Sequence, residues 1–145
     1  GLISGKKFRT IRDRKRPEVR YVMYQDGRRW KNLSRLIIDA PSHLMVDHIN
    51  RNTFDNRREN LRLCTNQQNQ ANSIKQRKKG HSKYKGVTYI DYRPNLTKKW
   101  QSSIYVNGKS VYIGNFSTEK EAALAYNAKA KEFFGGFSHL NEVAE

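Results

Sequence analysis

Apolar and polar positions alternate most clearly in the last third of the chain. Three stretches have the two-residue period of half-buried strands: 84–92, 100–106 and 109–116. Asn107-Gly108, between the last two, is a strong signal for a tight hairpin. Thr118 followed by Glu121 forms a capping box, which predicts a helix from Glu119 to about Phe134. The pattern therefore predicts three strands followed by one helix.

The same periodicity assigns faces to these elements. Apolar residues of the predicted helix fall on one side: Ala122, Ala125, Tyr126, Ala130 and Phe133. The alanines are small enough for that helix to lie close to a sheet. On the last two strands, Ser103, Tyr105, Ser110 and Tyr112 point away from Ile104, Val106, Val111 and Ile113. Trp100 and Phe116 are expected to pack in the core, because aromatic side chains bury large areas.

The first half reads as shorter elements. Strands are expected over 20–24 and 28–33, with a turn at Asp26-Gly27, and Ser34 is expected to cap a short helix over 35–39. A strand over 44–48 leads into a polar loop, 50–60, and a second strand, 61–64. Thr65 and Gln68 form another capping box, so a helix should begin there and fade near Lys75. The order is strand, loop, strand, helix.

Two basic segments carry little periodicity. Residues 1–20 could be a solvated arm, the remnant of a longer first strand, or an arm that follows DNA phosphates. Residues 76–83 contain Gly80 and no apolar residue, so they cannot contribute to a core and read as a basic linker. We therefore expect a first domain over 1–76, a basic linker over 77–83 and a second domain over 84–145.

Composition indicates which kind of molecule the protein binds. The 145 residues are 36% hydrophobic, which favours two thin layers over one large core. There are 29 Lys and Arg against 13 Asp and Glu, a net charge of +16, and this surplus favours a nucleic acid partner. No apolar run reaches membrane-span length and no signal peptide is visible. Cys64 is the single cysteine, which excludes an internal disulfide, and we expect it to be buried.

One group of residues has the chemistry of a nuclease. Asp47 and His48 leave a strand together, Asn60 lies further along the loop, and Asn69 lies at the start of the next helix. A carboxylate and an amide oxygen, from Asp47 and Asn69, suit a hard Mg²⁺-like ion that keeps several waters. His48 has the ordinary pKa of a general base, and Asn60 could accept a hydrogen bond from its other ring nitrogen. Spacing alone leaves ordinary loop chemistry open, because Asn-rich loops usually form turns.

The stretch 44–72 resembles the HNH family of endonucleases, in its homing type associated with introns and phages. The resemblance rests on three runs: Val46-Asp47-His48-Ile49, Asp55-Asn56-Arg57-Arg58-Glu59-Asn60-Leu61-Arg62 and Asn66-Gln67-Gln68-Asn69. It implies a ββα-metal finger (His-Me finger) in which His48 is the general base and Asn60 orients it. Asp47 and Asn69 would hold one metal ion per active site. Because the third position is Asn rather than His, Mg²⁺ or Mn²⁺ is favoured over a zinc-type ion.

The stretch 84–141 resembles the plant ethylene-response-factor (AP-two type) DNA-binding domain. The matching runs are Tyr84-Lys85-Gly86-Val87, Lys99-Trp100, Gly114-Asn115-Phe116, Glu121-Ala122-Ala123-Leu124-Ala125-Tyr126, Gly135 and Leu140-Asn141. The resemblance implies a three-stranded antiparallel sheet in the major groove with one helix behind it. The residues expected on the DNA face are Lys85, Thr88, Ile90, Lys99, Ser103, Tyr105, Ser110 and Tyr112. None of them is arginine, the residue that the relatives use there and that pairs well with guanine, so the relatives' target sequence cannot be carried over.

Together these features predict a two-domain α+β protein that binds double-stranded DNA and hydrolyses its phosphodiester bonds. The linker side chains Arg77, Lys78 and Lys79 are expected to contact phosphates. Two alternatives are a DNA-binding regulatory protein with a degenerate nuclease finger and, on charge alone, an RNA-binding protein. The resemblance implies a location in the cytoplasm or nucleoid of a prokaryotic host, with no membrane partner. The oligomeric state stays open, with a monomer favoured.

Overall fold

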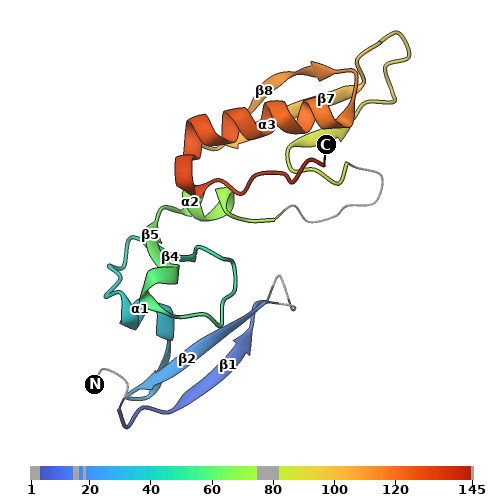
Figure 1. Cartoon of the computed structure of the whole chain (residues 1–145). Coiled ribbons are helices and arrows are strands. Elements are labelled where there is room, and N and C mark those ends of the chain that lie inside the picture. The colour runs from blue at the N-terminus through green and yellow to red at the C-terminus, as the bar shows by residue number, and fades with distance from the viewer. Residues whose placement is uncertain (1–3, 15–16, 18, 75–81, 145) are drawn as a thin grey trace. The chain divides into compact units, whose positions relative to one another are not determined.

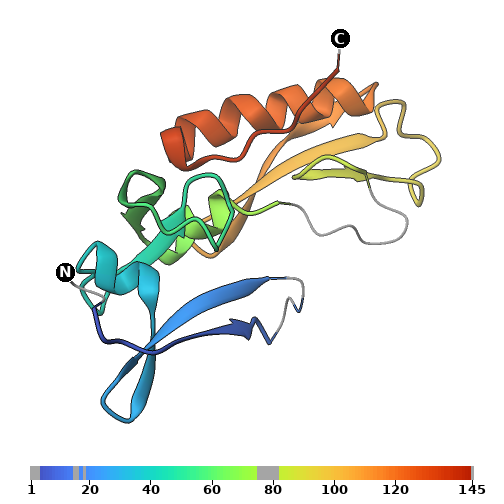
Figure 2. The ribbon, with the colours of Figure 1, turned by 60° about the horizontal axis from the view of Figure 1, so that its bottom comes forward.

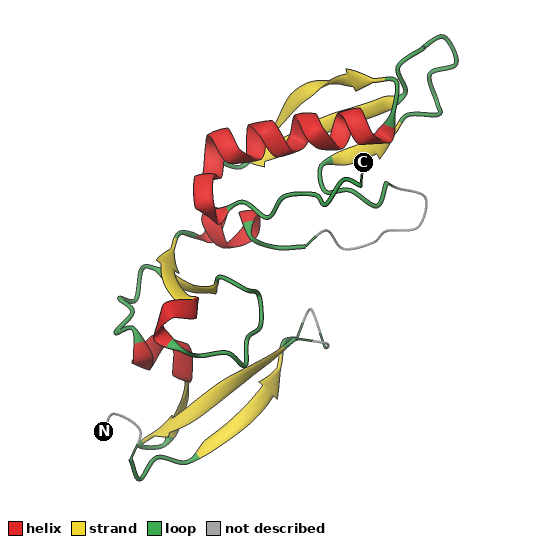
Figure 3. Ribbon diagram, viewed as in Figure 1, coloured by secondary structure: helices red, strands yellow, loops and turns green. Residues whose placement is uncertain are grey.

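Small antiparallel sheets and a few helices make up the chain (Figures 1 and 3). The computed structural model describes residues 4–14, 17, 19–74 and 82–144. Contacts divide the chain into two units, Gly1–Asn69 and Gln70–Glu145. This mixed architecture is of the α+β kind that the sequence predicts. Among the described residues, no helix is long and apolar enough to cross a membrane.

The first unit begins with a three-stranded sheet in the order β1-β2-β3. Its strands are β1 (Phe8–Arg12), β2 (Arg20–Asp26) and β3 (Arg29–Asn32). Part of the expected basic arm is thus a strand, which runs beside β2 in both ribbon views (Figures 1 and 2). Cations cover aromatic rings of this sheet, with the Arg9 guanidinium 4.3 Å from the Trp30 ring centre. Such stacking retains the charge while covering apolar surface.

The turns and caps of the first unit differ in detail from the prediction. Asp26 pairs with Arg29, so the turn consists of Gly27 and Arg28, and Gly27 takes the positive φ of 59° that the turn needs. The short helix α1 (Leu33–Ile37) begins after Asn32, whose side chain makes no capping bond. Ser34 lies inside the helix and is buried, so its expected capping role is wrong.

The remainder of the first unit follows the predicted order of strand, loop, strand and helix. Its elements are β4 (Met45–His48), the 3₁₀ turn η1 (Arg58–Asn60), β5 (Leu61–Cys64) and the start of α2 (Asn66–Ala71), whose last residues, from Gln70, belong to the second unit. The capping box at α2 is confirmed, since Thr65 and Gln68 each accept a hydrogen bond from the other's backbone N–H. The helix ends at Ala71, earlier than expected.

In the second unit two strands and the helix have the expected ends, while the first strand, expected over 84–92, is shorter. The elements are β6 (Val87–Tyr89), β7 (Trp100–Val106), β8 (Lys109–Phe116), α3 (Glu119–Phe134) and the 3₁₀ turn η2 (Gly135–Phe137). Asn107 and Gly108 both have positive φ, as the tight hairpin requires. The capping box of Thr118 and Glu121 is complete. These local signals therefore determine most of this unit.

Helix α3 covers one face of the β6-β7-β8 sheet (Figures 1 and 3). Ala122, Ala123 and Ala130 are almost fully buried, which lets the helix approach the strands closely. Trp100 and Phe116 pack against this core, as predicted. Phe133 was expected on the buried face but is 42% exposed, and Phe134 packs against the core instead. Helix α3 does not cover the opposite face of the sheet.

Candidate functional site

The β4–β5 hairpin places the two central residues of the candidate nuclease site at the end where the loop 49–60 connects the strands. Asp47 pairs with Arg62, and His48 pairs with Leu61. Asp47 and His48 are only 5% and 7% exposed. An ionisable pair that is buried at the start of a polar loop is typical of functional sites.

The Asp47 carboxylate is oriented by its partner on the neighbouring strand. Nε and Nη2 of Arg62 donate to Asp47 Oδ2 over 2.8 and 2.7 Å. Both side chains are largely shielded from water, so this charge-assisted pair compensates the cost of burying the carboxylate. Arg62, which is not one of the expected site residues, thus sets the orientation of the Asp47 carboxylate, a candidate metal ligand.

Asn60 closes the loop that follows His48. Its Oδ1 accepts from the backbone N–H of Asn50 over 3.0 Å, and its Nδ2 donates to the backbone oxygen of Asp55 over 2.7 Å. The backbone of Ile49 also donates to Asn60 O over 2.9 Å. Because Asn60 is 6% exposed, these bonds are shielded from competing water. Asn60 therefore fixes the loop from within.

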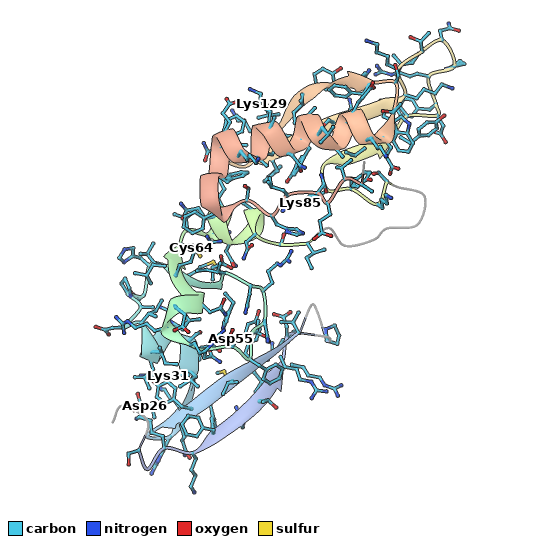
Figure 4. The ribbon with its side chains drawn as sticks, in the orientation of Figure 1. Asp26, Lys31, Asp55, Cys64, Lys85 and Lys129 are labelled. Carbon is cyan, nitrogen blue, oxygen red and sulfur yellow. The ribbon has the colours of Figure 1, made fainter. Side chains whose placement is uncertain are left out.

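Asp55, labelled in Figure 4, accepts hydrogen bonds from several side chains of the same loop. Its two carboxylate oxygens accept from Nε and Nη2 of Arg57, both over 2.8 Å, and from Nδ2 of Asn50 over 2.8 Å. The hydrogen bond from the Arg57 side chain is the main cause that holds the pKa of Asp55 well below its usual range. Asp55 therefore remains charged and occupied in structural bonds.

His48 meets Asn56 rather than Asn60. Its Nε2 lies 3.2 Å from Asn56 Oδ1, so the structure gives Asn56 the hydrogen bond that we had expected for Asn60. Burial lowers the pKa of His48, while the bond to Asn56 and the charges of Asp47 and Asp55 act in the opposite direction. The imidazole is therefore neutral near pH 7, the state in which a general base can take a proton.

Asn69 lies on α2 beside β4. Its Nδ2 is 4.0 Å from the sulfur of Met45, which lies two residues before Asp47 and so shares its side of the strand. With the amide nitrogen turned to the sulfur, Oδ1 is the atom that could bind a cation. Within the described ranges, no group of three or more His, Cys, Asp or Glu side chains could hold a metal. A metal here would depend on one carboxylate, one amide oxygen and water, a donor set that hard divalent ions accept.

The uncovered face of the second unit's sheet carries most of the expected DNA-facing residues. Tyr105 pairs with Ser110, and Ser103 pairs with Tyr112, so the four lie on one face. Both tyrosines are well exposed, at 60% and 58%. Thr88, Gln101 and Asn115 continue this face as a row across the three strands. The sequence analysis missed Gln101 and Asn115, although alternation along β7 would have indicated Gln101. Ile90, expected on this face, is buried.

The basic residues expected to contact DNA differ in their surroundings. The Lys85 ammonium donates to the backbone oxygens of Gln70, Ala71 and Ser73 over 2.7–3.1 Å, and so caps the end of α2 (Figure 4). Cations at a helix C-terminus satisfy carbonyls that would otherwise lack partners. The side chain of Lys99 is half-buried. Arg77, Lys78 and Lys79 lie outside the described residues, so their contact with phosphates stays a prediction.

Comparisons with known proteins agree with both resemblances. Residues 39–71 match the model of the HNH endonuclease family. "Uncharacterized HNH endonuclease L560" of Acanthamoeba polyphaga mimivirus is 39% identical over 110 residues, which are 74% of this chain and 54% of that protein. "AP2-like ethylene-responsive transcription factor TOE2" of Arabidopsis thaliana is 44% identical over 62 residues, 43% of this chain and 12% of that protein. "Dehydration-responsive element-binding protein 2D" of the same plant is 37% identical over 76 residues, 50% and 37% of the two chains.

These matches confirm the two-part resemblance, with an HNH-type region followed by an AP2-like region. The chain spans about half the length of the mimivirus relative and much less of the plant proteins. No solved structure matches the chain significantly. The family match supports a nuclease, while an association with phages, introns or homing stays a prediction.

Proposed function

Because residues 39–71 match the HNH endonuclease family and the C-terminal region is similar to AP2-type DNA-binding proteins, we propose that this protein is a metal-dependent endonuclease of duplex DNA. The observation that carries the proposal is that Asp47 and His48, consecutive residues at the end of β4, are both buried where a tightly hydrogen-bonded loop begins. A carboxylate and a neutral imidazole in this arrangement have the chemistry for phosphodiester hydrolysis.

In this proposal the two strands of the β4–β5 hairpin and helix α2 form a ββα-metal finger. His48 takes a proton from the attacking water, and Asn60 keeps the loop in the shape that presents the imidazole to the phosphate. Asp47 and Asn69 would hold one Mg²⁺ or Mn²⁺ ion through a carboxylate and an amide oxygen. When bound, the ion would neutralise phosphate charge and stabilise the leaving oxygen. Arg62 keeps the Asp47 carboxylate in its orientation.

Removal of divalent metal tests the proposal directly. The full chain is expected to nick or linearise supercoiled plasmid in Mg²⁺ or Mn²⁺ and to lose this activity in excess chelator. Asp47→Ala should behave in metal as the unaltered chain behaves in chelator, because the single charged ligand is gone. Cleavage is followed on agarose gels, and DNA binding is measured separately by fluorescence anisotropy. Undiminished cutting in chelator would exclude the proposed mechanism, and binding without cutting would favour a regulatory protein with a degenerate finger.

We propose that the uncovered sheet face of the second unit contacts base edges, while the basic linker contacts phosphates. The exposed side chains of Tyr105, Ser110 and Tyr112 support the first part, since hydroxyl and aromatic groups can interact with base edges and methyl groups. The net charge of +16 supports the second. A location in the cytoplasm or nucleoid of a prokaryotic host stays a prediction, and the relative that covers most of this chain comes from a virus.

Replacement of Tyr105 by alanine is expected to change which duplexes are preferred, by about 1–3 kcal/mol if the ring or hydroxyl contacts a base. Neutralising Arg77, Lys78 and Lys79 together should weaken binding to all sequences about equally. It should also reduce the slope of log K against the logarithm of salt concentration, by about 0.9 per lost phosphate contact. Anisotropy titrations against salt, with a preferred and a scrambled duplex, separate the two effects. Tyr92→Ala is the matched control, because Tyr92 is 73% exposed but lies in the loop after β6. The assignment is wrong if Tyr105→Ala and Tyr92→Ala have equal effects.

A further inference from the structure

The hydrogen bonds around Asn56 determine which of its side-chain atoms faces His48. Asn56 Nδ2 donates to the backbone oxygens of Thr53 and Phe54 over 3.4 and 3.3 Å. Carbonyl oxygens only accept, so the amide nitrogen must be the atom that points to them. The remaining atom, Oδ1, is therefore the one that lies 3.2 Å from His48 Nε2.

This arrangement has a consequence for the imidazole, because an amide oxygen cannot donate. Nε2 of His48 must carry the hydrogen in this contact, and in the neutral ring the lone pair then lies on Nδ1. A ring whose two nitrogens are differentiated in this way has a defined tautomer before any substrate binds.

We propose that Asn56 is the positioning residue of the nuclease site: its amide oxygen accepts a hydrogen bond from Nε2 and so holds His48 in the Nε2–H tautomer. The inference rests on the proposed function for the role of His48 in catalysis. It differs from the family resemblance, which assigns the orienting role to Asn60. In the structure Asn60 makes its side-chain bonds to Asn50 and Asp55.

The loop holds Asn56 firmly enough for this task. The amide is bound on its nitrogen side by two carbonyls, and the backbone N–H of Asn56 donates to Phe54 O over 3.1 Å. Thr53 Oγ1 in turn donates to the backbone oxygen of Arg20 on β2. The side chain that orients His48 is therefore connected to the three-stranded sheet of the same unit, which limits its rotation.

Two variants of similar size distinguish a positioning role from a loop-building role. Asn56→Leu removes the acceptor while filling similar space. Asn56→Asp retains an oxygen that can accept from Nε2 but gives up the two Nδ2 donations, so the two variants separate the acceptor from the donor role of the amide. The matched control is Asn52→Leu, because Asn52 lies in the same loop and its Oδ1 accepts from the backbone N–H of Phe54. All variants are made in the full chain.

The first measurement is the ¹⁵N shift pattern of the His48 ring, recorded without metal or DNA. We expect the unaltered chain and Asn56→Asp to show a protonated Nε2 and an unprotonated Nδ1, and Asn56→Leu to show mixed tautomers. The second is steady-state plasmid cleavage. Asn56→Leu is expected to lower kcat about 10–100-fold with little change in KM, while Asn52→Leu retains kcat within a few fold.

The outcomes separate this inference from the proposed function. A neutral ring protonated on Nδ1 in the unaltered chain would overturn the inference, as would a tautomer that Asn56→Leu leaves unchanged. Equal losses of kcat in Asn52→Leu and Asn56→Leu would also overturn it, since they would reduce Asn56 to a loop-building residue. If no chain cleaves DNA in metal, the proposed function fails and the catalytic part of the inference fails with it, while the tautomer still reports the hydrogen bond.

Discussion

His48→Ala is expected to slow DNA cleavage by about 10²–10⁴-fold while DNA affinity is retained, because a positioned general base contributes about that much. The cleavage rate of the unaltered chain should also be maintained to a lower pH than if His48 had the usual pKa of histidine. Burial lowers the pKa of His48, so the ring stays neutral until the pH falls below the usual range, and activity is then lost as the ring becomes protonated. Initial rates of plasmid cleavage over a pH series measure both effects.

The control for this variant is His43→Ala. His43 is an exposed histidine in the same unit, just before β4, so its removal should change neither the rate nor its pH dependence. Circular dichroism checks that both variants fold. The role of His48 as the base is refuted if His48→Ala cleaves at the parental rate, or if His43→Ala loses as much activity.

Gly86→Ala is expected to destabilise the second unit by about 2–5 kcal/mol, combining a left-handed backbone with steric overlap. Gly86 has a φ of 76°, and a Cβ there would lie 2.0 Å from Cδ2 of Tyr126 and 2.6 Å from the backbone oxygen of Ser103. Tyr126 is 4% exposed and cannot turn outward without opening the core. Urea unfolding followed by the fluorescence of Trp100, in a Trp30→Phe background, measures the loss.

Gly108→Ala separates the two causes. Gly108 has a similar φ of 81°, but a Cβ there would meet nothing within 4 Å. Its replacement should therefore cost only the backbone strain, about 1–2 kcal/mol. If both variants lose the same stability, the contact between Gly86 and Tyr126 has no energetic role.

Sequence signals of short range predicted the second unit well. The ends of β7, β8 and α3 follow from the Asn107-Gly108 turn and the Thr118–Glu121 capping box, which depend on neighbours within a few residues. Phe133 and Phe134 could not be separated in this way, because both lie near the edge of the apolar face and only packing decides between them.

Contacts between distant residues were not predictable. Lys85 was expected at DNA, yet its ammonium caps α2, and nothing in the local sequence of Lys85 indicates a helix end some 14 residues earlier. The candidate site shows the same limit. The loop contains several asparagines of identical chemistry, so the sequence places an amide near His48 but does not reveal whether it belongs to Asn56 or Asn60. Their roles became distinct only with the geometry of the loop.

Cys64 makes the candidate site observable by a chemical method that needs no substrate. The thiol is 2% exposed at the end of β5, next to the strand that carries Asp47 and His48, and burial is the main cause that raises its pKa to about 11 (Figure 4). Roughly one thiol in ten thousand is then ionised near pH 7, so alkylating reagents and oxidants have almost no thiolate to attack while the hairpin is closed. Since this is the single cysteine of the chain, the labelling rate reports how often this one hairpin opens. Any metal ion or DNA that binds only the closed hairpin slows labelling by mass action, which turns the thiol into an intrinsic gauge of site occupancy.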